Sequence, residues 1–290
     1  GVIRTRDDIP PRLVKLYYVE VDSVRGVPVH ARPRPVELVE KTPGRYALKQ
    51  EGDTLRRRPE VTFILEATDR KNDVSNTFGL WRIREFADED PIFELRIDGF
   101  AFDQTRYCNA VTHYPMQVAS RNEVIRLTRL DGCIDDFYPV LKNQALLTPS
   151  EGQSQQIRIE AEDDSGNRSI LEFRTIRQPA QQDFRAVCDS TALIVDNRRP
   201  FSHTAGEASV HIPAGVFYEP LFSVSRAARP NSPPRRRSPS SSPSIPILDY
   251  DTPLHTAATL RSGICSSELT TPHHPGFRPQ REGFLCRRKI

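Results

Sequence analysis

The 290-residue chain lacks long apolar runs, a strong charge of either sign and the short motifs that mark most catalytic sites. No window approaches the roughly 18 uncharged apolar residues that a membrane-spanning helix requires, so the sequence predicts no transmembrane segment. The 41 basic and 38 acidic residues leave a formal charge of +3. This near balance creates no overall field that would favour nucleic acid as a partner.

Cysteine is scarce, and its spacing is irregular. The five cysteines form no C-x-x-C pair and lie far apart in the chain: Cys108, Cys133, Cys188, Cys265 and Cys286. An odd number leaves at least one thiol unpaired, and the spacing fits neither a disulfide framework nor a four-cysteine zinc site. We therefore expect small buried or incidental thiols.

The chain begins at Gly1 instead of a methionine and continues with the polar stretch GVIRTRDDIPPR. This stretch has none of the features of a targeting signal. We expect that the natural N-terminus was removed by processing or lies upstream of Gly1.

Short runs rich in β-branched and aromatic residues recur along the first 178 residues. These runs are typical of β-strands and lie at 12–22, 60–69, 78–86, 92–98, 123–130, 155–163 and 169–176. In QQIRIEAED (155–163), Ile157, Ile159 and Ala161 fall on one face and the charged residues between them on the other, as in a half-buried strand. The sequence predicts an all-β protein in which residues 1–180 form an immunoglobulin-like antiparallel β-sandwich.

The stretch AEDDSGNRSILEF (161–173) gathers three acidic residues, Glu162, Asp163 and Asp164. The segment IEAED at 159–163, which overlaps its start, is echoed by LEATD at 65–69. DDSGN lies between two expected strands and has the composition of a hairpin turn, in which Gly166 takes a positive φ. The sequence favours a turn over the two alternatives, a structural cation and a catalytic carboxylate pair. The D-x-[DN]-x-[DN]-G pattern of Ca²⁺ loops is absent.

Four segments carry a resemblance to a known family. DDIPPRLVKLYYVEVD, EATDR followed by NTFGLWRI, RIDGFAFDQTRYCNAVTHY and RIEAEDDSGNRSILEF occur in this order. Together they resemble the region downstream of the catalytic domain in lysostaphin-like zinc metallopeptidases of Gram-negative envelopes, the murein endopeptidases that cut peptide cross-links in peptidoglycan. The most specific element is F-x-F-D-x-T-R-Y-x-N at 100–109. The resemblance extends over residues 5–225.

The resemblance implies a non-catalytic accessory region of an envelope endopeptidase. The expected partners are a catalytic peptidase domain in cis and either peptidoglycan or an envelope protein, in the periplasm or at the outer membrane. Zinc would belong only to the catalytic domain, which is missing from this chain. No cofactor is expected in the chain itself.

The zinc ligands of this family are not found in the chain. Those enzymes use H-x-x-x-D and H-x-H, because three side chains and a water must converge on one tetrahedral ion. His203 has Glu207 four positions later in HTAGE, but no H-x-H completes a site. The remaining histidines give no ligand pattern: His30, His113, His211, His255, His273 and His274. The sequence therefore predicts no catalytic, cofactor-binding or metal-binding residue.

Other catalytic patterns are also missing, including G-x-S-x-G, G-x-x-x-x-G-K-[ST], H-E-x-x-H and G-x-G-x-x-G. Two alternatives to the accessory role stay open. One is an independent adhesin-like β-sandwich that binds an extracellular partner. The other is a cryptic carboxylate-based hydrolase, because two catalytic carboxylates need to be close only in space.

A second, smaller β domain is expected over residues 181–263. Strand-like runs at 191–201 and 206–222 lead into the turn Pro213-Ala214-Gly215, and the pattern resumes at 249–263. The Pro-, Ser- and Arg-rich insertion at 226–244 is expected to be disordered. A less favoured alternative is that its Arg235–Arg237 run contacts an anionic surface. Residues 264–290 read as an irregular basic tail that suggests a truncated or frame-shifted end.

Overall fold

The computed structural model describes residues 7–24, 27–57, 60–178, 193–205, 208–223, 258–261 and 266–269. The chain divides into two compact units, Gly1–Gln181 and Gln182–Ile290. The expected disordered insertion at 226–244 and most of the expected tail at 264–290 lie outside the described residues.

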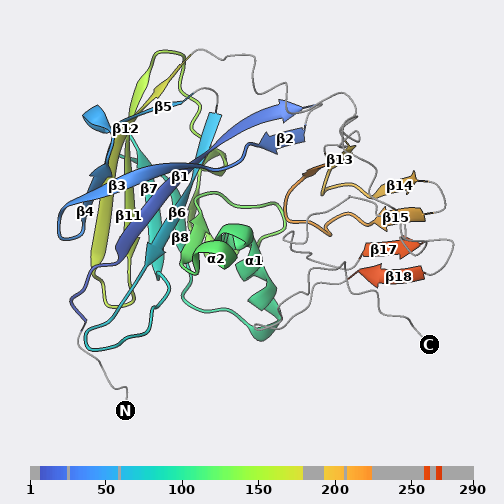
Figure 1. The fold of residues 1–290 in the computed structure, drawn as a ribbon, viewed down its shortest axis with the longest axis horizontal. Coiled ribbons are helices and arrows are strands. Elements are labelled where there is room, and N and C mark those ends of the chain that lie inside the picture. The colour runs from blue at the N-terminus through green and yellow to red at the C-terminus, as the bar shows by residue number, and fades with distance from the viewer. Residues whose placement is uncertain are drawn as a thin grey trace, which may run out of the picture. The chain divides into compact units, whose positions relative to one another are not determined.

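The first unit is built mainly from β-strands, as the sequence predicts. Its strands form a twelve-stranded sheet in the order β10-β8-β7-β11-β12-β4-β3-β1-β6-β9, with β2 paired to β1 and β5 paired to β12 (Figure 1). The strands are β1 (Arg12–Val24), β2 (Val27–His30), β3 (Arg34–Thr42), β4 (Arg45–Leu48), β5 (Thr54–Arg57), β6 (Glu60–Thr68), β7 (Arg82–Ala87), β8 (Asp90–Arg96), β9 (Glu123–Arg126), β10 (Val140–Leu141), β11 (Ser154–Glu162) and β12 (Arg168–Arg177).

Strand β3 joins the two halves of this sheet. Its first residues pair with β1 and its later residues pair with β4, so hydrogen bonding passes from one half to the other. The pairs within the sheet are antiparallel except those of β12 with β4 and with β5, which are parallel. The purely antiparallel arrangement predicted from the sequence is wrong at these two pairs. The β3–β4 hairpin fixes the direction of β4 before it meets β12.

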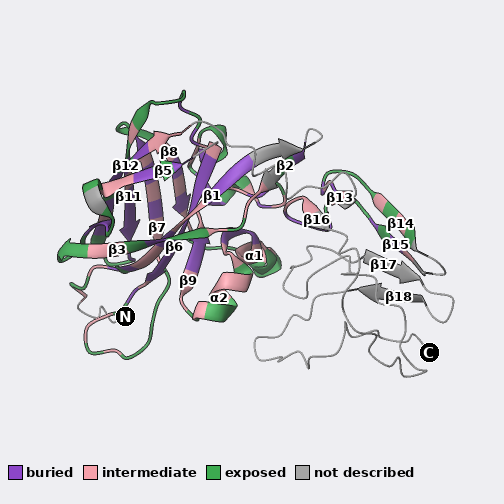
Figure 2. Ribbon diagram, turned by 45° about the horizontal axis from the view of Figure 1, so that its top comes forward, coloured by how far each residue is buried: buried purple, intermediate pink, exposed green. Residues whose placement is uncertain are grey.

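The core of the first unit lies between the two halves of the curled sheet. Phe63 on β6 and Phe173 on β12 meet edge to face with their ring centroids 5.5 Å apart, although the two strands are not neighbours in the sheet. Ile157, Ile159 and Ala161 on β11 are fully buried, as predicted. Glu160 and Glu162 on the opposite face are buried too, so this part of β11 is covered on both faces and is not the half-buried strand that the sequence predicted (Figure 2 gives the burial along the ribbon). Edge-to-face aromatic pairs add to the stabilisation from apolar burial.

The other face of β6 is also covered, so all seven residues of VTFILEA (61–67) are buried, including the polar Thr62 and Glu66. Ile64 packs in a cluster with Val19 and Val124, and Met116 packs against this cluster from α2. Helix α2 (Tyr114–Ser120) has a proline in its first turn and ends at Arg121 in the left-handed region. A strand buried on both faces loses the alternating pattern of a half-buried strand.

The helical segments of the first unit are all short and were not predicted from the sequence. They are the 3₁₀ turns η1 (Glu51–Asp53), η2 (Phe102–Tyr107), η3 (Asp135–Phe137) and η4 (Asn143–Ala145), and the α-helices α1 (Cys108–Val111) and α2. Throughout the described residues, the helices are too short or too polar to cross a membrane.

The second unit contains short strands as well. They are β13 (Leu193–Val195), β14 (Phe201–Ala205), β15 (Ala208–Ile212), β16 (Leu221–Ser223), β17 (Ala258–Arg261) and β18 (Ser266–Leu269). Strand β13 pairs with β16, and the other four form a sheet in the order β14-β15-β17-β18. A small apolar cluster includes Val195, Val210 and Phe217, and Gly215 has a φ of 76° in the predicted turn.

All seven runs predicted as strands contain strands, whereas several short strands were not predicted. Strand β3, with the sequence RPVELVEKT, is mostly exposed and carries few apolar residues. Strands β2, β4 and β5 have four residues each, too few for a clear period. These strands form because the neighbouring long strands supply hydrogen-bonding edges.

The contact between Phe63 and Phe173 predicts a large loss of stability when either ring is removed. Phe63→Ala should lower the free energy of unfolding by about 3–5 kcal/mol, because a large buried side chain leaves a cavity. Guanidinium denaturation followed by Trp81 fluorescence measures the change. Phe102→Ala is the matched control, since Phe102 is fully exposed. Equal losses for both variants would contradict this account of the core.

Candidate functional site

Two strands from opposite halves of the sheet end in a buried aspartate. The inward face of β6 runs through Phe63, Leu65 and Ala67, and one further step of two residues reaches Asp69. The inward face of β11 reaches Asp163 in the same way. Asp69 is 1% exposed and Asp163 is 0% exposed. The sequence echo LEATD and IEAED therefore corresponds to two acids at the rim of the core.

Asp163 organises the turn predicted for DDSGN. Its Oδ1 accepts hydrogen bonds from the backbone N–H of Ser165 (2.8 Å) and Asn167 (2.9 Å), and its Oδ2 accepts one from Asn167 Nδ2 at 2.8 Å. Gly166 has a φ of 92°. The turn joins β11 and β12 as an antiparallel hairpin, so the predicted hairpin turn is confirmed.

Asp7 completes the group from the segment that precedes β1. Carboxylate oxygens of Asp7, Asp69 and Asp163, which we name the aspartate cluster, all lie within 4.8 Å of one another. The side-chain amide of Asn167 donates to the backbone carbonyl of Asp7 at 3.1 Å, which ties this segment to the β11–β12 turn. The three members come from positions about 60 to 160 residues apart, so their meeting depends on the fold.

Asp69 is the member with the least compensation for its charge. Burial is the main cause that raises its pKa, to about 6, and the negative charge of Asp163 raises it further. Its Oδ1 is buried and accepts no hydrogen bond. A backbone hydrogen bond from Arg70 lowers the pKa but does not offset the rise. A buried carboxylate that is only partly hydrogen-bonded is costly to ionise, so the cluster favours a bound proton or a cation.

A lysine lies near the cluster but is engaged with a different acid. Lys71 Nζ donates to both carboxylate oxygens of Asp164, at 2.6 and 2.7 Å, and lies over the ring of Phe78 at 5.4 Å. Its pKa is raised, chiefly by the hydrogen bond to Asp164, with smaller contributions from Asp7 and Asp69. Its ammonium therefore neutralises Asp164 more directly than it neutralises the cluster.

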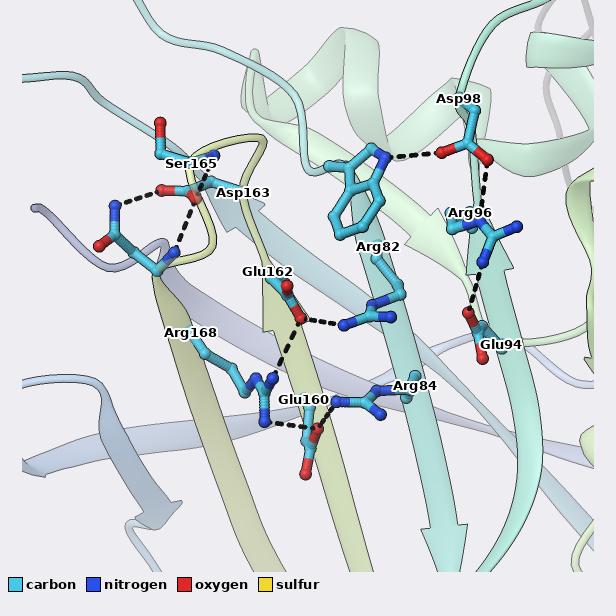
Figure 3. Close-up of polar contacts among 12 residues, drawn as sticks. Arg82, Arg84, Glu94, Arg96, Asp98, Glu160, Glu162, Asp163, Ser165 and Arg168 are labelled. Atoms are coloured by element: carbon cyan, nitrogen blue, oxygen red, sulfur yellow. Dashed lines mark hydrogen bonds and ion pairs between the residues drawn. The ribbon is translucent and has the colours of Figure 1, made fainter. Parts of the chain in front are cut away.

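The three consecutive acids of the predicted turn have different partners, and Figure 3 shows this for Glu162 and Asp163. Glu162 faces the outer side of the sheet, where Arg82 contacts it at 2.6 Å and Arg168 at 3.4 Å. Asp164 is exposed and pairs with Lys71, whereas Asp163 turns inward. A carboxylate pair made of neighbouring residues in this stretch does not form.

The outer face of β7, β11 and β12 carries a network of glutamates and arginines next to this turn. Glu160 contacts Arg84 at 2.6 Å and Arg168 at 3.6 Å, and it also pairs with Arg158 (Figure 3). Both Glu160 and Glu162 are largely covered by these arginines. Each glutamate has several arginine partners that balance its charge. The network is therefore explained as a structural part of the sheet, without a ligand.

Two further carboxylates have raised pKa values. Glu85 lies on the inward face of β7, is 0% exposed and accepts no hydrogen bond, and burial raises its pKa well above the usual value. Burial is also the main cause that raises the pKa of Glu123 to about 7, while its hydrogen bond from the backbone N–H of Leu80 (2.8 Å) opposes the rise. Glu85 is enclosed in the core, where a substrate could not reach it.

The histidines considered from the sequence lie in separate places. His203 on β14 stacks on Phe201, with ring centroids 6.3 Å apart, and His211 on β15 shares a 2.8 Å hydrogen bond with Ser202. His30 and His113 belong to the first unit. Glu207, His255, His273 and His274 lie outside the described residues, as do Cys188, Cys265 and Cys286.

Sequence reasoning favoured a plain turn at Glu162, Asp163 and Asp164, kept a cation there only as an alternative, and missed Asp7 and Asp69 as neighbours of Asp163. The signal that was available was the repeat of the pattern Leu/Ile-Glu-Ala-x-Asp at the ends of two expected strands. Because side chains alternate along a strand, both aspartates continue an inward series of apolar residues. No comparable signal pointed to Asp7.

A scan of protein-family models found no match to the chain, and searches of curated proteins and of solved structures found none either.

The buried Glu85 predicts a characteristic dependence of stability on pH. Its pKa is raised in the folded state, so folding keeps a proton that the unfolded chain releases above about pH 4.3. The contribution of Glu85 to stability is therefore present at low pH and is lost as the pH rises. Glu85→Gln should reduce the fall in unfolding free energy between pH 5 and 8.

Urea denaturation at several pH values measures this difference, with Glu172→Gln as the control. Glu172 is an exposed residue on β12, so the same substitution there should leave the pH profile unchanged. Parallel profiles for wild type and Glu85→Gln would refute a neutral, buried Glu85.

Proposed function

We propose that the chain is the non-catalytic C-terminal region of a lysostaphin-like peptidoglycan endopeptidase of the bacterial cell envelope. In this proposal it positions or regulates a zinc-dependent catalytic domain that lies outside the chain. The first unit would be an immunoglobulin-like sandwich and the second a smaller β domain. The packing of β6 against β12 across a shared core supports the first of these assignments.

The observation that carries the proposal is a concentration of exposed aromatic and apolar side chains in one connection. Six large apolar side chains are exposed among the described residues, and four of them lie between β8 and β9: Phe100, Phe102, Tyr114 and Val118. Phe102 is 100% exposed. Exposed apolar surface of this kind is typical of protein interaction sites.

Phe100 and Phe102 are also the two phenylalanines of the F-x-F-D-x-T-R-Y-x-N element, on which the family resemblance depends most. Phe100 has one ring neighbour, Phe137, at 6.3 Å, and Phe102 contributes nothing to the core. Packing within this chain therefore does not explain why a phenylalanine stands at position 102. A surface that binds another domain would explain it, because aromatic side chains supply large contact areas at interfaces.

The acidic groups of the first unit give less support to a hydrolase. In the described part of the chain, the acids that converge closely enough to hold an ion are three aspartates, with no histidine among them. A lysostaphin-like zinc site requires histidines as well as a carboxylate. Glu85, whose pKa is strongly raised, is enclosed in the core. These features favour a role in binding over a role in catalysis.

The purified chain should not release soluble muropeptides from isolated sacculi, with or without added zinc. The reason is that no described group is arranged to polarise a peptide carbonyl or to lower the pKa of an attacking water. The assay uses the chain with zinc, with a chelator, and as a His203→Ala variant. Zinc-dependent release that His203→Ala abolishes would make the second unit an active site and would overturn the accessory role.

The proposed interaction surface can be tested with the domain encoded upstream of Gly1. That upstream sequence should contain the zinc-ligand motifs H-x-x-x-D and H-x-H. An upstream sequence without these motifs would favour the adhesin-like alternative. Calorimetry should detect binding between the upstream domain and this chain, and Phe102→Ser should weaken the binding about tenfold or more, as expected for a buried aromatic anchor.

The control for this experiment is Phe78→Ser, which removes an aromatic side chain outside the connection. Phe78 is 37% exposed, so it also presents an aromatic ring to solvent, although less fully than Phe102, which is 100% exposed. Binding that is weakened equally by Phe78→Ser and Phe102→Ser would contradict a surface centred on the 100–118 segment.

A further inference from the structure

The aspartate cluster combines three negative charges with a buried oxygen that has no donor. Asp7, Asp69 and Asp163 bring carboxylate oxygens within 4.8 Å of one another, and two of these side chains are almost completely buried. Like charges at this separation repel strongly when water is excluded. The fold therefore holds together groups that would otherwise separate.

Asp69 supplies the observation that points to a ligand. It is 1% exposed, and its Oδ1 lacks a hydrogen-bond partner. Buried carboxylates in proteins are paired with a cation or hydrogen-bonded on most of their lone pairs. Lys71 is bound to Asp164, so the described side chains leave Asp69 without a direct positive partner.

Asp163 can serve the turn and a ligand at the same time. Its Oδ1 accepts two backbone hydrogen bonds, whereas its Oδ2 accepts one, from Asn167. A carboxylate oxygen has two lone pairs, so Oδ2 retains one for a further contact. The hairpin turn therefore orients Oδ2 of Asp163 and leaves one of its lone pairs able to bind a ligand.

We propose that Asp7, Asp69 and Asp163 form a binding site for a divalent cation, and that Ca²⁺ is the ion it takes. The spacing suits this ion: with Ca–O distances of about 2.3–2.6 Å, ligands on opposite sides lie about 4.6–5.2 Å apart. All three ligands are oxygens, which Ca²⁺ prefers, and the site offers neither the thiolate nor the imidazole typical of zinc. Water completes the six to eight ligands of Ca²⁺.

The ion would connect three chain segments at one end of the sheet, where the start of β1 already pairs with the end of β6 (Arg12 opposite Thr68). Asp7 precedes β1, Asp69 follows β6, and Asp163 follows β11. Binding would therefore link the paired ends of β1 and β6 to the end of β11, which lies in the other half of the sheet. This proposal concerns a site separate from the exposed aromatic segment, so its failure would leave the proposed accessory function unaffected.

The test measures Ca²⁺ binding to the full chain after removal of metal with a chelator. Calorimetry with CaCl₂ should show one site. Addition of 1 mM Ca²⁺ should raise the Tm of the first transition by about 5 °C or more, if this concentration exceeds the Kd about 100-fold. Asp69→Asn keeps the shape of the side chain but removes its charge, and it should abolish both the heat of binding and the rise in Tm.

Asp164→Asn is the matched control, because Asp164 neighbours Asp163 but is exposed and paired with Lys71. This variant should keep the response to Ca²⁺. If Asp69→Asn does not fold, Asp7→Asn replaces it, since Asp7 is only half-buried and precedes the first strand. Asp7→Asn should weaken Ca²⁺ binding about tenfold or more, as the loss of a charged ligand lowers affinity.

Three results would overturn the proposal. The first is a wild-type Tm that does not change up to 5 mM Ca²⁺. The second is a Ca²⁺ response that persists unchanged in Asp69→Asn or Asp7→Asn. The third is an equal response to Mg²⁺, which would contradict the assignment of Ca²⁺, because Mg²⁺ demands a tighter octahedral site.

Discussion

The alternation of side chains along β6 and β11 is the constraint on which the rest of the first unit depends. Each strand buries every second residue in the space between the two halves of the curled sheet, and Phe63 meets Phe173 there. The same alternation continues one step beyond the last apolar position of each strand. At that step both sequences have an aspartate, Asp69 and Asp163, so the geometry that builds the core also brings two acids together.

The buried acids of the first unit fall into two groups, which differ in whether their charges are balanced by a hydrogen-bonded partner. On the outer face, Glu160 and Glu162 are covered by arginines that contact them at 2.6 Å, so their charges are balanced by hydrogen-bonded partners. On the inner face, Asp69 and Glu85 have buried oxygens without donors, and burial raises both pKa values. The outer acids stabilise strand pairing, whereas the inner ones make the folded state depend on protons or on a bound ion.

The exposed connection between β8 and β9 has a different chemical character from the cluster. Its aromatic side chains face solvent, although helix α2 in the same connection anchors it to the sheet through Met116. A segment that is fixed at its base and apolar at its surface is suited to contact with another protein. The proposed accessory role assigns that contact to a catalytic domain, and the proposed Ca²⁺ site would hold the beginning of β1 in position.

The sequence by itself determined the long strands, the alternation in QQIRIEAED and the turn at DDSGN, because each follows from local patterns of side chains and backbone preference. It did not determine the short strands β2, β4 and β5, which form only beside the long ones, or the parallel pairs of β12. It left a cation at the DDSGN turn only as an alternative to a plain turn, although the motif that ends in Asp163 is repeated at Asp69. Only the tertiary structure decided that these two residues meet each other and Asp7, because the curl of the sheet brings together strand ends that are far apart in the chain.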